Sequence, residues 1–185
     1  MSIEDASTKT VERLPEDYGD RQAPVCTDTI PVTLILDNLR SAFNTGNIFR
    51  VADAVRVERI IGCGYTPLPP HKKLHKTARG CDNTVPTEHC PDALTAVEQC
   101  RQEGYTVYAV ETGEKAETVW DVALEFPAAF LCGNEALGVS ADGLEKCDYI
   151  IKIPCMGYKH SINVGNCVAV TVYESLRQWR RYDRI

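Results

Sequence analysis

The chain has 185 residues, a hydrophobic fraction of 44% and a formal net charge of −6 at pH 7. This length suits one sizeable hydrophobic core and is short for two, so we predict a single domain. No apolar stretch approaches membrane-spanning length, and residues 1–23 lack the basic start and apolar run of a signal peptide. We therefore expect a soluble, cytoplasmic protein with no membrane partner.

Cysteine is frequent, but nine cysteines without a signal peptide or a C-x-x-C pair do not predict a disulfide framework. We expect reduced thiols that pack as small hydrophobic side chains and have no catalytic role. Those in or beside apolar runs are Cys63, Cys132, Cys147 and Cys167. One His/Cys cluster matches no common zinc spacing, so we predict no metal site. Its members are His71, His75, Cys81, His89 and Cys90.

The charge is unevenly distributed along the chain. From Asp82 to Tyr149 there are three basic and fourteen acidic residues, so basic side chains gather elsewhere. One basic group, with no acid among its members, suits contact with phosphates, and we expect RNA binding there by Lys72, Lys73, Lys76 and Arg79. A second group near the C-terminus contains Arg177, Arg180, Arg181 and Arg184, interleaved with Trp179 and Tyr182. Interleaved arginines and aromatic residues suit phosphates and unstacked bases, although cations at a helix end also favour the helix dipole.

In chain order, the first feature is a polar, acidic stretch without clear periodicity, which we treat as an arm over residues 1–30 before a domain over 31–185. An apolar, β-branched run then predicts a strand at 32–37. A helix is predicted over about 44–55 and a second strand at 58–64. Together they form a strand–helix–strand unit.

A loop rich in Pro and Lys follows at 65–80, with proline preventing a regular element at its start. Alternation then resumes with a helix at 91–103, strands at 105–110, 128–132 and 149–154, and a last helix at 163–181. In that helix Val164, Val168, Val172 and Leu176 recur every four residues and predict one buried face. The pattern predicts an α/β fold, a mostly parallel sheet with helices on both faces and ligands at the carboxyl ends of its strands.

Three segments combine glycine with polar groups, and each follows a predicted strand. The first, NTGNIFR, runs from Asn44 to Arg50. Asn44 suits a helix N-cap. A partly buried Arg50 would need partners for five N–H donors, which indicates a site.

The second segment, CGNEALGVS, carries Glu135, and its Gly and Asn residues also suit an ordinary turn. The third, IPCMGYKHSINVGN, leads into the last helix. Its Ser161 and Asn163 could cap that helix or contact an anion or a ribose hydroxyl. Because all three segments follow strands of one sheet, we expect them to meet at one edge.

In order and spacing these segments resemble the motifs of the SpoU-like (TrmH-type) family of RNA ribose methyltransferases, of the SPOUT class, over residues 31–179. The family pattern is an Asn-to-Arg helix start, a G-N-E-x-x-G loop, and I-P-x-x-G followed by S-x-N. The resemblance implies methyl transfer from S-adenosylmethionine to a ribose 2′-hydroxyl of tRNA or rRNA by a homodimer. It also implies a deep C-terminal trefoil knot, which ordinary chain topology avoids.

The resemblance also assigns roles to single positions. It implies that Asn44 and Arg50 face the target ribose, that Glu135 supports that site, and that Ser161 and Asn163 complete it. It further implies a cofactor site built mainly from main-chain groups. The residues expected there are Leu131, Gly133, Asn134, Ile153, Met156, Gly157, Ser161 and Ile162.

Two roles in proton handling stay open at this point. A guanidinium remains protonated, so we expect Arg50 to orient the hydroxyl and stabilise developing alkoxide charge rather than act as a base. Glu135 either fixes Arg50 through paired hydrogen bonds or accepts the proton. Neither role requires a metal.

Some positions depart from the family pattern. Arg56 replaces a glycine near the end of the first-motif helix, which leaves the local backbone turn open. Asn166 and Cys167 stand where small Ser or Ala residues are common, and we expect altered packing in the knot. In the homodimer we expect the last helix to form part of the interface through Tyr173, Leu176 and Trp179.

Other functions fit parts of the pattern. Methylation of a base nitrogen by the same fold is one alternative. An RNA-binding module that has lost transfer is another, although the intact set of site residues argues against it. A nicotinamide- or nucleotide-binding enzyme would also alternate strands and helices, but neither G-x-G-x-x-G nor G-x-x-x-x-G-K-[ST] occurs.

Overall fold

One sheet forms the centre of residues 29–182, the part of the chain that the computed structural model describes. Its strand order is β3-β2-β1-β6-β4-β7-β5, and every pairing is parallel. The strands are β1 (Ile30–Asp37), β2 (Val57–Cys63), β3 (Thr87–Cys90), β4 (Thr106–Val110), β5 (Glu117–Thr118), β6 (Ala128–Cys132) and β7 (Tyr149–Lys152). The predicted arm at 1–30 lies almost wholly outside the described residues, as do the side chains of Arg181, Tyr182 and Arg184.

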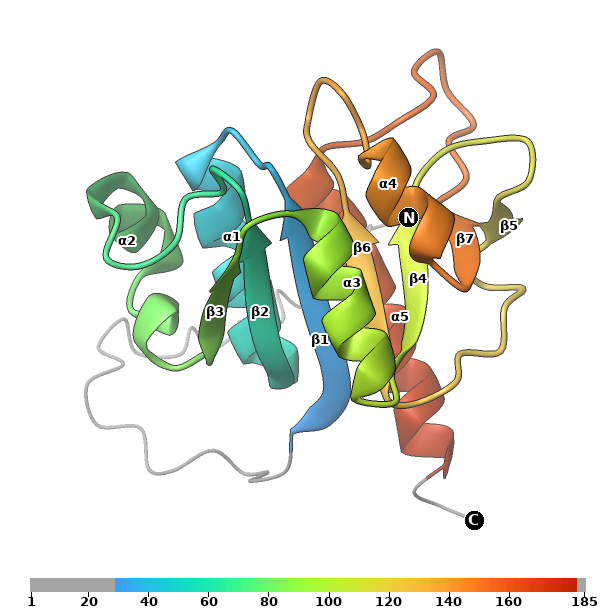
Figure 1. Cartoon of the computed structure of the whole chain (residues 1–185), viewed down its shortest axis with the longest axis horizontal. Helices are drawn as coiled ribbons and strands as arrows, with labels where there is room; N and C mark the ends of the chain where they lie inside the picture. The colour runs from blue at the N-terminus through green and yellow to red at the C-terminus, as the bar shows by residue number, and fades with distance from the viewer. Residues whose placement is uncertain (1–28, 183–185) are drawn as a thin grey trace, which may run out of the picture.

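Helices cover both faces of the sheet (Figure 1). In that view α3 and α4 lie in front of the sheet, and α1 and α5 lie behind it. A further short helix, α2, lies beside α1 at the β3 end of the sheet. The helices are α1 (Ala42–Val55), α2 (Lys72–Ala78), α3 (Ala93–Gln102), α4 (Ala141–Lys146) and α5 (Val164–Tyr182), with a short 3-10 helix at Cys81–Asn83.

Alternation along the central strands creates a core on each face. In β1, Leu34 and Leu36 pack with α1 and α5, whereas Ile35 packs with α3 on the other face. In β6, Phe130 likewise packs on the face covered by α1 and α5, and Leu131 packs on the face covered by α3. Successive side chains of a strand point to opposite faces, so a strand buried on both faces must be apolar throughout. This is why the two runs could be recognised as strands.

Most predicted elements are confirmed within a residue or two of their bounds, as is the parallel α/β class. The knot expected from the resemblance stays a prediction. The first helix begins at Ala42 rather than Asn44, because the Ser41 hydroxyl caps it by accepting from the Asn44 N–H. The expectation of a plain loop at 65–80 is wrong, since it contains α2. Sequence patterning also missed the short elements β3, β5 and α4.

Close packing against α1 fixes the position of α2. The two helices meet at Gly46, where a Cβ would lie only 2.6 Å from Thr77 Cβ and 2.9 Å from the Leu74 carbonyl oxygen. Only glycine permits this approach. Leu74 and Ala78 of α2 are buried in the contact. The exposed basic side chains of α2 are therefore carried on a firmly packed helix.

Arg56, the departure from the family glycine, ends α1 in the left-handed conformation with φ of 57°. Its N–H donates to the carbonyl groups of Ala52 and Asp53, which closes the last turn. The turn that glycine usually makes is thus made by an arginine, at a steric cost that glycine avoids.

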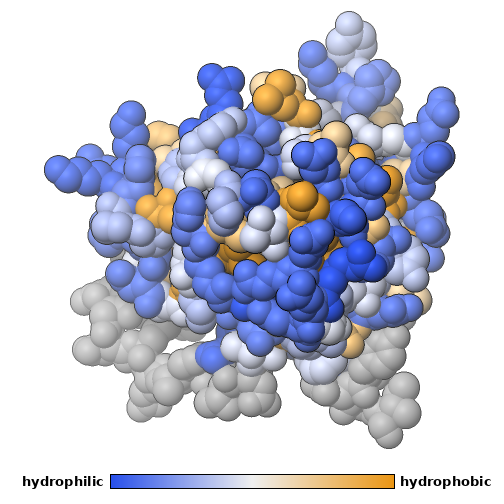
Figure 2. Space-filling model, in the orientation of Figure 1, coloured by the Kyte–Doolittle hydropathy of each residue, from blue (hydrophilic) through white to orange (hydrophobic). Residues whose placement is uncertain are grey.

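The face covered by α3 and α4 is largely hydrophilic, with apolar atoms in scattered patches (Figure 2). Both helices belong to the acidic stretch from Asp82 to Tyr149. Within the described part of the chain, no helix is both long and apolar enough to span a membrane.

Candidate active site

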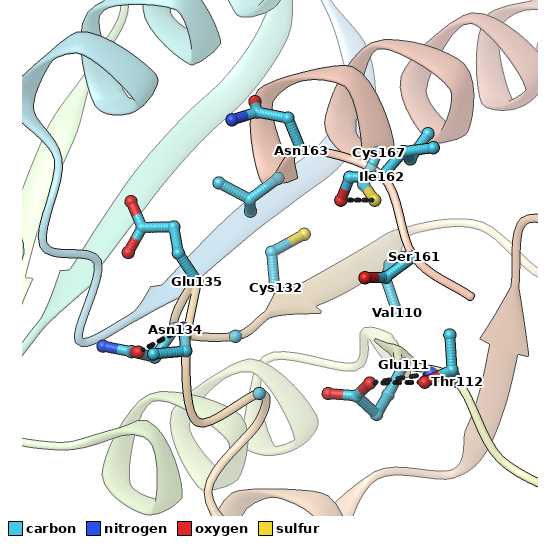
Figure 3. A pocket seen from close by; sticks show the side chains of 14 residues that line it. Val110, Glu111, Thr112, Cys132, Asn134, Glu135, Ser161, Ile162, Asn163 and Cys167 are labelled. Carbon is cyan, nitrogen blue, oxygen red and sulfur yellow. Dashed lines mark hydrogen bonds between the residues drawn. The ribbon is translucent and has the colours of Figure 1, made fainter. Parts of the chain in front are cut away.

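The three sequence motifs meet at one edge of the sheet, as predicted. β1, β6, β4 and β7 are neighbours in the sheet, although the chain runs from β1 out to β3 before it returns to β4. Such a reversal of strand order opens a crevice at the carboxyl ends of the strands. A cavity of about 450 Å³ lies there (Figure 3). Its walls come from the ends of β4 and β6, the loop at 133–140, and residues 161–167 at the start of α5.

The loop after β6 folds back on itself, held by Asn134. The main-chain groups of Asn134 and Gly138 exchange two hydrogen bonds of 2.9 Å. The Asn134 side chain accepts from the N–H groups of Ala136 and Leu137, and it donates to the Asn38 carbonyl oxygen at 2.6 Å. A Cβ at Gly133 would lie 2.2 Å from main-chain atoms of Gly138 and Val139. Gly133 is therefore required for the loop to close, before any ligand is considered.

Glu135 joins this loop to the first motif. One carboxylate oxygen accepts from the Arg40 N–H at 2.9 Å. The other accepts from the Ser41 N–H at 3.1 Å and from the Asn44 side chain at 2.8 Å. Partial burial by itself raises the pKa of Glu135, but these hydrogen bonds to the charged form outweigh it and lower the pKa below 4.5. Glu135 is consequently a weaker base than an ordinary glutamate.

The third motif reaches the same network through Asn163. Its side-chain N–H group donates to the Asn44 side-chain oxygen at 3.1 Å, and its own side-chain oxygen accepts from the Gly165 N–H at 2.9 Å. Asn163 therefore caps α5 and contacts the first motif at once. Ser161 is exposed and lines the cavity (Figure 3). One hydrogen-bonded chain, Glu135–Asn44–Asn163, thus links the three motifs.

Arg50 is placed differently from the other predicted site residues. It is exposed on α1 and is not among the residues that line the cavity, so the expected burial of its guanidinium is wrong. Within residues 29–182 no ion pair or hydrogen bond of Arg50 is present that would explain it as a structural residue. Glu135, its expected partner, engages Asn44 and main-chain groups instead.

Half of the positions expected to bind the cofactor line the cavity. They are Gly133, Asn134, Ser161 and Ile162. The others are not among the lining residues: Leu131 and Ile153 pack with the core clusters, Met156 is 96% exposed, and Gly157 has open space around it. The last two belong to the segment 153–163, whose residues are mostly exposed.

Sequence reasoning missed two acidic residues that hold the cavity loop. Asp37, at the end of β1, is 2% exposed and accepts from the Ser140 N–H at 2.8 Å. Glu111 directly follows β4, lines the cavity, and accepts from the Val139 N–H at 3.0 Å. Both follow apolar strand runs at the sheet edge where ligands gather. An acidic residue at the carboxyl end of a predicted strand could therefore have indicated Asp37 and Glu111 from the sequence.

The cysteines behave as buried side chains. Every cysteine in the described part of the chain is free. Burial raises the pKa of Cys147 to about 12 and that of Cys167 to about 11, and it raises the pKa values of Cys63 and Cys132 as well. These thiols are therefore protonated near neutral pH. Among residues 29–182 no group of three or more His, Cys, Asp or Glu is arranged to hold a metal ion.

The basic residues of the loop at 65–80 are exposed together on and beside α2. Lys72, Lys73 and Lys76 belong to the helix, and Arg79 is its C-cap. Because α2 packs on α1, which carries Asn44 and Arg50, this surface lies on the same structural unit as the first motif. Of the C-terminal basic group, Arg177 is paired with Glu174.

Comparisons with known proteins agree with this geometry. The chain matches the SpoU rRNA Methylase family over residues 31–173. A tRNA (guanosine(18)-2'-O)-methyltransferase of Thermus thermophilus is 33% identical over 156 residues, which cover 83% of this chain and 79% of that protein.

Solved structures show the same fold. The SpoU methyltransferase AviRb of Streptomyces viridochromogenes, in complex with AdoMet, has a TM-score of 0.69 at 30% identity, covering 84% of this chain and 59% of that one. A TrmH/SpoU tRNA modifying enzyme of A. aeolicus has a TM-score of 0.76 at 23% identity, covering 84% of this chain and 78% of that one. The second likeness concerns the fold alone.

Proposed function

The chain belongs to the SpoU rRNA methylase family, and from this premise we propose that it methylates a ribose 2′-hydroxyl of a tRNA or rRNA. It is an S-adenosylmethionine-dependent RNA methyltransferase. One observation carries the assignment of the site: the three motifs are joined by hydrogen bonds beside a single cavity at the strand-order reversal.

The cavity has properties that fit S-adenosylmethionine. Its volume of about 450 Å³ lies within the usual range for ligand sites, roughly 300–1,000 Å³. Its lining combines apolar groups such as Val110 and Ile162 with polar groups such as Ser161. When bound, the cofactor supplies an electrophilic methyl group on a positively charged sulfur. Gly133 and Gly138 line that cavity, and because glycine has no side chain, main-chain groups form part of its wall.

Arg50 is proposed to orient the ribose and to stabilise the oxygen as it loses its proton. A guanidinium offers a planar set of five donors and keeps its charge, which suits both tasks. Orientation of the hydroxyl about 3–3.5 Å from the methyl carbon can lower the barrier by roughly 7–11 kcal/mol. The exposure of Arg50 leaves it available to a substrate.

Glu135 is proposed to position the first motif rather than to accept the proton. Its oxygens already receive three hydrogen bonds and its pKa is lowered, so protonation by the substrate is unfavourable. As the new O–CH₃ bond forms and the S–CH₃ bond breaks, the hydroxyl proton leaves to water or to a phosphate of the RNA. Hydrogen bonds from Asn44 to Glu135 and from Asn163 to Asn44 hold the start of α1 beside the cavity.

A second copy of the chain is proposed to complete the site. Arg50 lies outside the cavity of its own chain, so a homodimer that brings Arg50 of one copy to the cavity of the other would satisfy the chemistry. Exposed apolar groups on the two contacting helices support such an interface: Phe43 on α1 is 67% exposed and Tyr173 on α5 is 54% exposed. Leu176 and Trp179 pack inward instead, against the core.

We place this enzyme in the cytoplasm, with its RNA substrates.

The RNA is proposed to contact α2 through Lys72, Lys73, Lys76 and Arg79. All four are exposed, and phosphate contacts by such side chains supply most sequence-independent affinity. The hydrophilic face covered by α3 and α4 (Figure 2) belongs to the acidic stretch from Asp82 to Tyr149, which makes it a poor alternative for this role.

Nucleoside analysis of methylated RNA tests the proposal. The full-length protein is incubated with S-adenosylmethionine and with unmodified tRNA or rRNA transcripts, which are then digested to nucleosides and measured by mass spectrometry. We expect a 2′-O-methylnucleoside. A methylated base would favour the base-directed alternative, and RNA binding without any methyl transfer would favour the inactive binding module.

A further inference from the structure

Two carboxylates line the cavity, and among the lining residues there is no lysine, arginine or histidine. One belongs to Glu135, which is committed to Asn44 and main-chain groups of the first motif. The other belongs to Glu111, which lies outside all three motifs. Figure 3 shows that the two enter the cavity from different loops.

Glu111 has a fixed position on the cavity wall. One carboxylate oxygen accepts from the Thr112 N–H at 2.8 Å and from its hydroxyl at 3.3 Å. The other accepts from the Val139 N–H at 3.0 Å. These donors are all uncharged, so they orient the carboxylate without neutralising it. The wall therefore carries a negative charge held in place by two loops.

A fixed negative charge distinguishes the methyl donor from its product. The donor carries a positive sulfonium, whereas the thioether product, S-adenosylhomocysteine, has lost the methyl group on sulfur and with it the positive charge, and is otherwise the same. In a partly enclosed cavity, a nearby carboxylate stabilises the cation more than the neutral form, because charges interact more strongly away from bulk water. We infer that Glu111 sets the preference of the cavity for the cationic methyl donor over its neutral thioether product. This inference rests on the proposed cofactor site.

If Glu111 only supports the structure of the cavity, a different result is expected. If Glu111 only holds the loop through Val139, or only contacts the ribose of the cofactor, its loss weakens donor and product equally. The ratio of the two dissociation constants separates these roles, since the ligands differ only at the sulfur.

Calorimetric titration of the full-length chain with each ligand measures that ratio. For Glu111→Gln we expect the preference, Kd of S-adenosylhomocysteine divided by Kd of S-adenosylmethionine, to fall about tenfold, which corresponds to about 1.4 kcal/mol. Product inhibition of methyl transfer should become stronger to a similar extent. Glu114→Gln is the matched control, because Glu114 is exposed in the same loop and does not line the cavity. It should leave the ratio unchanged.

Each result decides a different point. An unchanged ratio in Glu111→Gln, or an equal loss for both ligands, overturns the role of Glu111. Failure of the wild-type chain to bind either ligand contradicts the proposed cofactor site instead. If Glu111→Gln does not fold, the wild-type ratio is measured as salt increases: it should fall as the charge is screened, and a constant ratio overturns the inference.

Discussion

Arg50 is the residue for which structural and catalytic explanations differ most sharply. Its guanidinium is exposed, and no ion pair of the described residues holds it to the fold. A residue in that position has little reason to affect stability. Its role is better sought in contacts made only when RNA and a second copy of the chain are present.

Replacement of Arg50 tests this role. We expect Arg50→Ala to lower single-turnover methyl transfer by about 100- to 1,000-fold, the usual effect of removing one transition-state donor. Cofactor affinity and melting temperature should stay close to wild type. Arg50→Lys should restore little, because lysine lacks the planar fork. Wild-type transfer rates in Arg50→Ala, or activity lost only in step with melting, would contradict the assignment.

Glu135 makes a pH-dependent contribution to stability. Its pKa is lower in the folded state than the ordinary 4.5, so the unfolded chain binds the proton more tightly. The stabilisation is fully present above the unfolded pKa and is lost as the pH falls through the lower folded pKa. Neutralisation of the side chain should mimic that loss.

Urea unfolding at two pH values measures it. We expect Glu135→Gln to reduce the free energy of unfolding by about 1 kcal/mol at pH 7, since solvent exposure weakens these charge-assisted hydrogen bonds. The deficit should shrink at pH 3, where the wild-type carboxylate is also becoming protonated. Glu114→Gln, in an exposed loop, is the control. A deficit that is the same at both pH values would show that charge is not its cause.

At the scale of elements, α2 carries most of the exposed positive charge near the first motif. Its contact at Gly46 leaves no room for a side chain, so the helix has one position on α1. Phosphate binding by such a rigid surface has a characteristic dependence on salt, because each contact releases counterions.

The lysines of α2 can be tested through that dependence. We expect Lys73→Ala and Lys76→Ala each to weaken RNA binding similarly for all sequences, and to reduce the slope of log affinity against log salt by about 1. Lys115→Ala is the matched control, since Lys115 is exposed in the acidic stretch. Unchanged slopes in both α2 variants would mean that these cations do not contact the RNA and only interact with water and with the helix dipole.

At the scale of the whole molecule, the proposed site requires Arg50 on α1 of one copy to reach the cavity of a second copy. A stable interface buries roughly 800 Å² on each partner. The exposed side chains of Phe43 and Tyr173 lie on the two contacting helices behind the sheet, which makes this face suitable.

Sedimentation of the wild-type chain should show a dimer at micromolar concentration. Tyr173→Asp should shift it toward the monomer and lower methyl transfer, since Arg50 would no longer reach a partner cavity. Trp120→Asp is the control, because Trp120 is a similarly exposed aromatic residue that follows β5 and is not part of α1 or α5. A monomeric wild-type chain that transfers methyl groups at full rate would exclude the shared site.

Local patterns of residues were enough to predict the order and type of the main elements, the meeting of the three motifs and the family to which they belong. The apolar run at 32–37 and the four-residue spacing of apolar residues in α5 show which faces are buried. Such patterns involve only residues that are close together in the sequence. The carboxyl ends of neighbouring parallel strands must then lie at one edge, so Asn44, Glu135 and Asn163 were expected together.

The individual atomic contacts of the site could not be predicted from such patterns. Glu135 bonds to Asn44 and to main-chain groups rather than to Arg50, Arg50 is exposed, and Glu111 reaches the cavity from a segment without a motif. Hydrogen bonds depend on differences of a few tenths of an ångström and on the angle at the donor. Those quantities follow from strand register, loop closure and helix packing across distant parts of the chain, which no local pattern of residues contains.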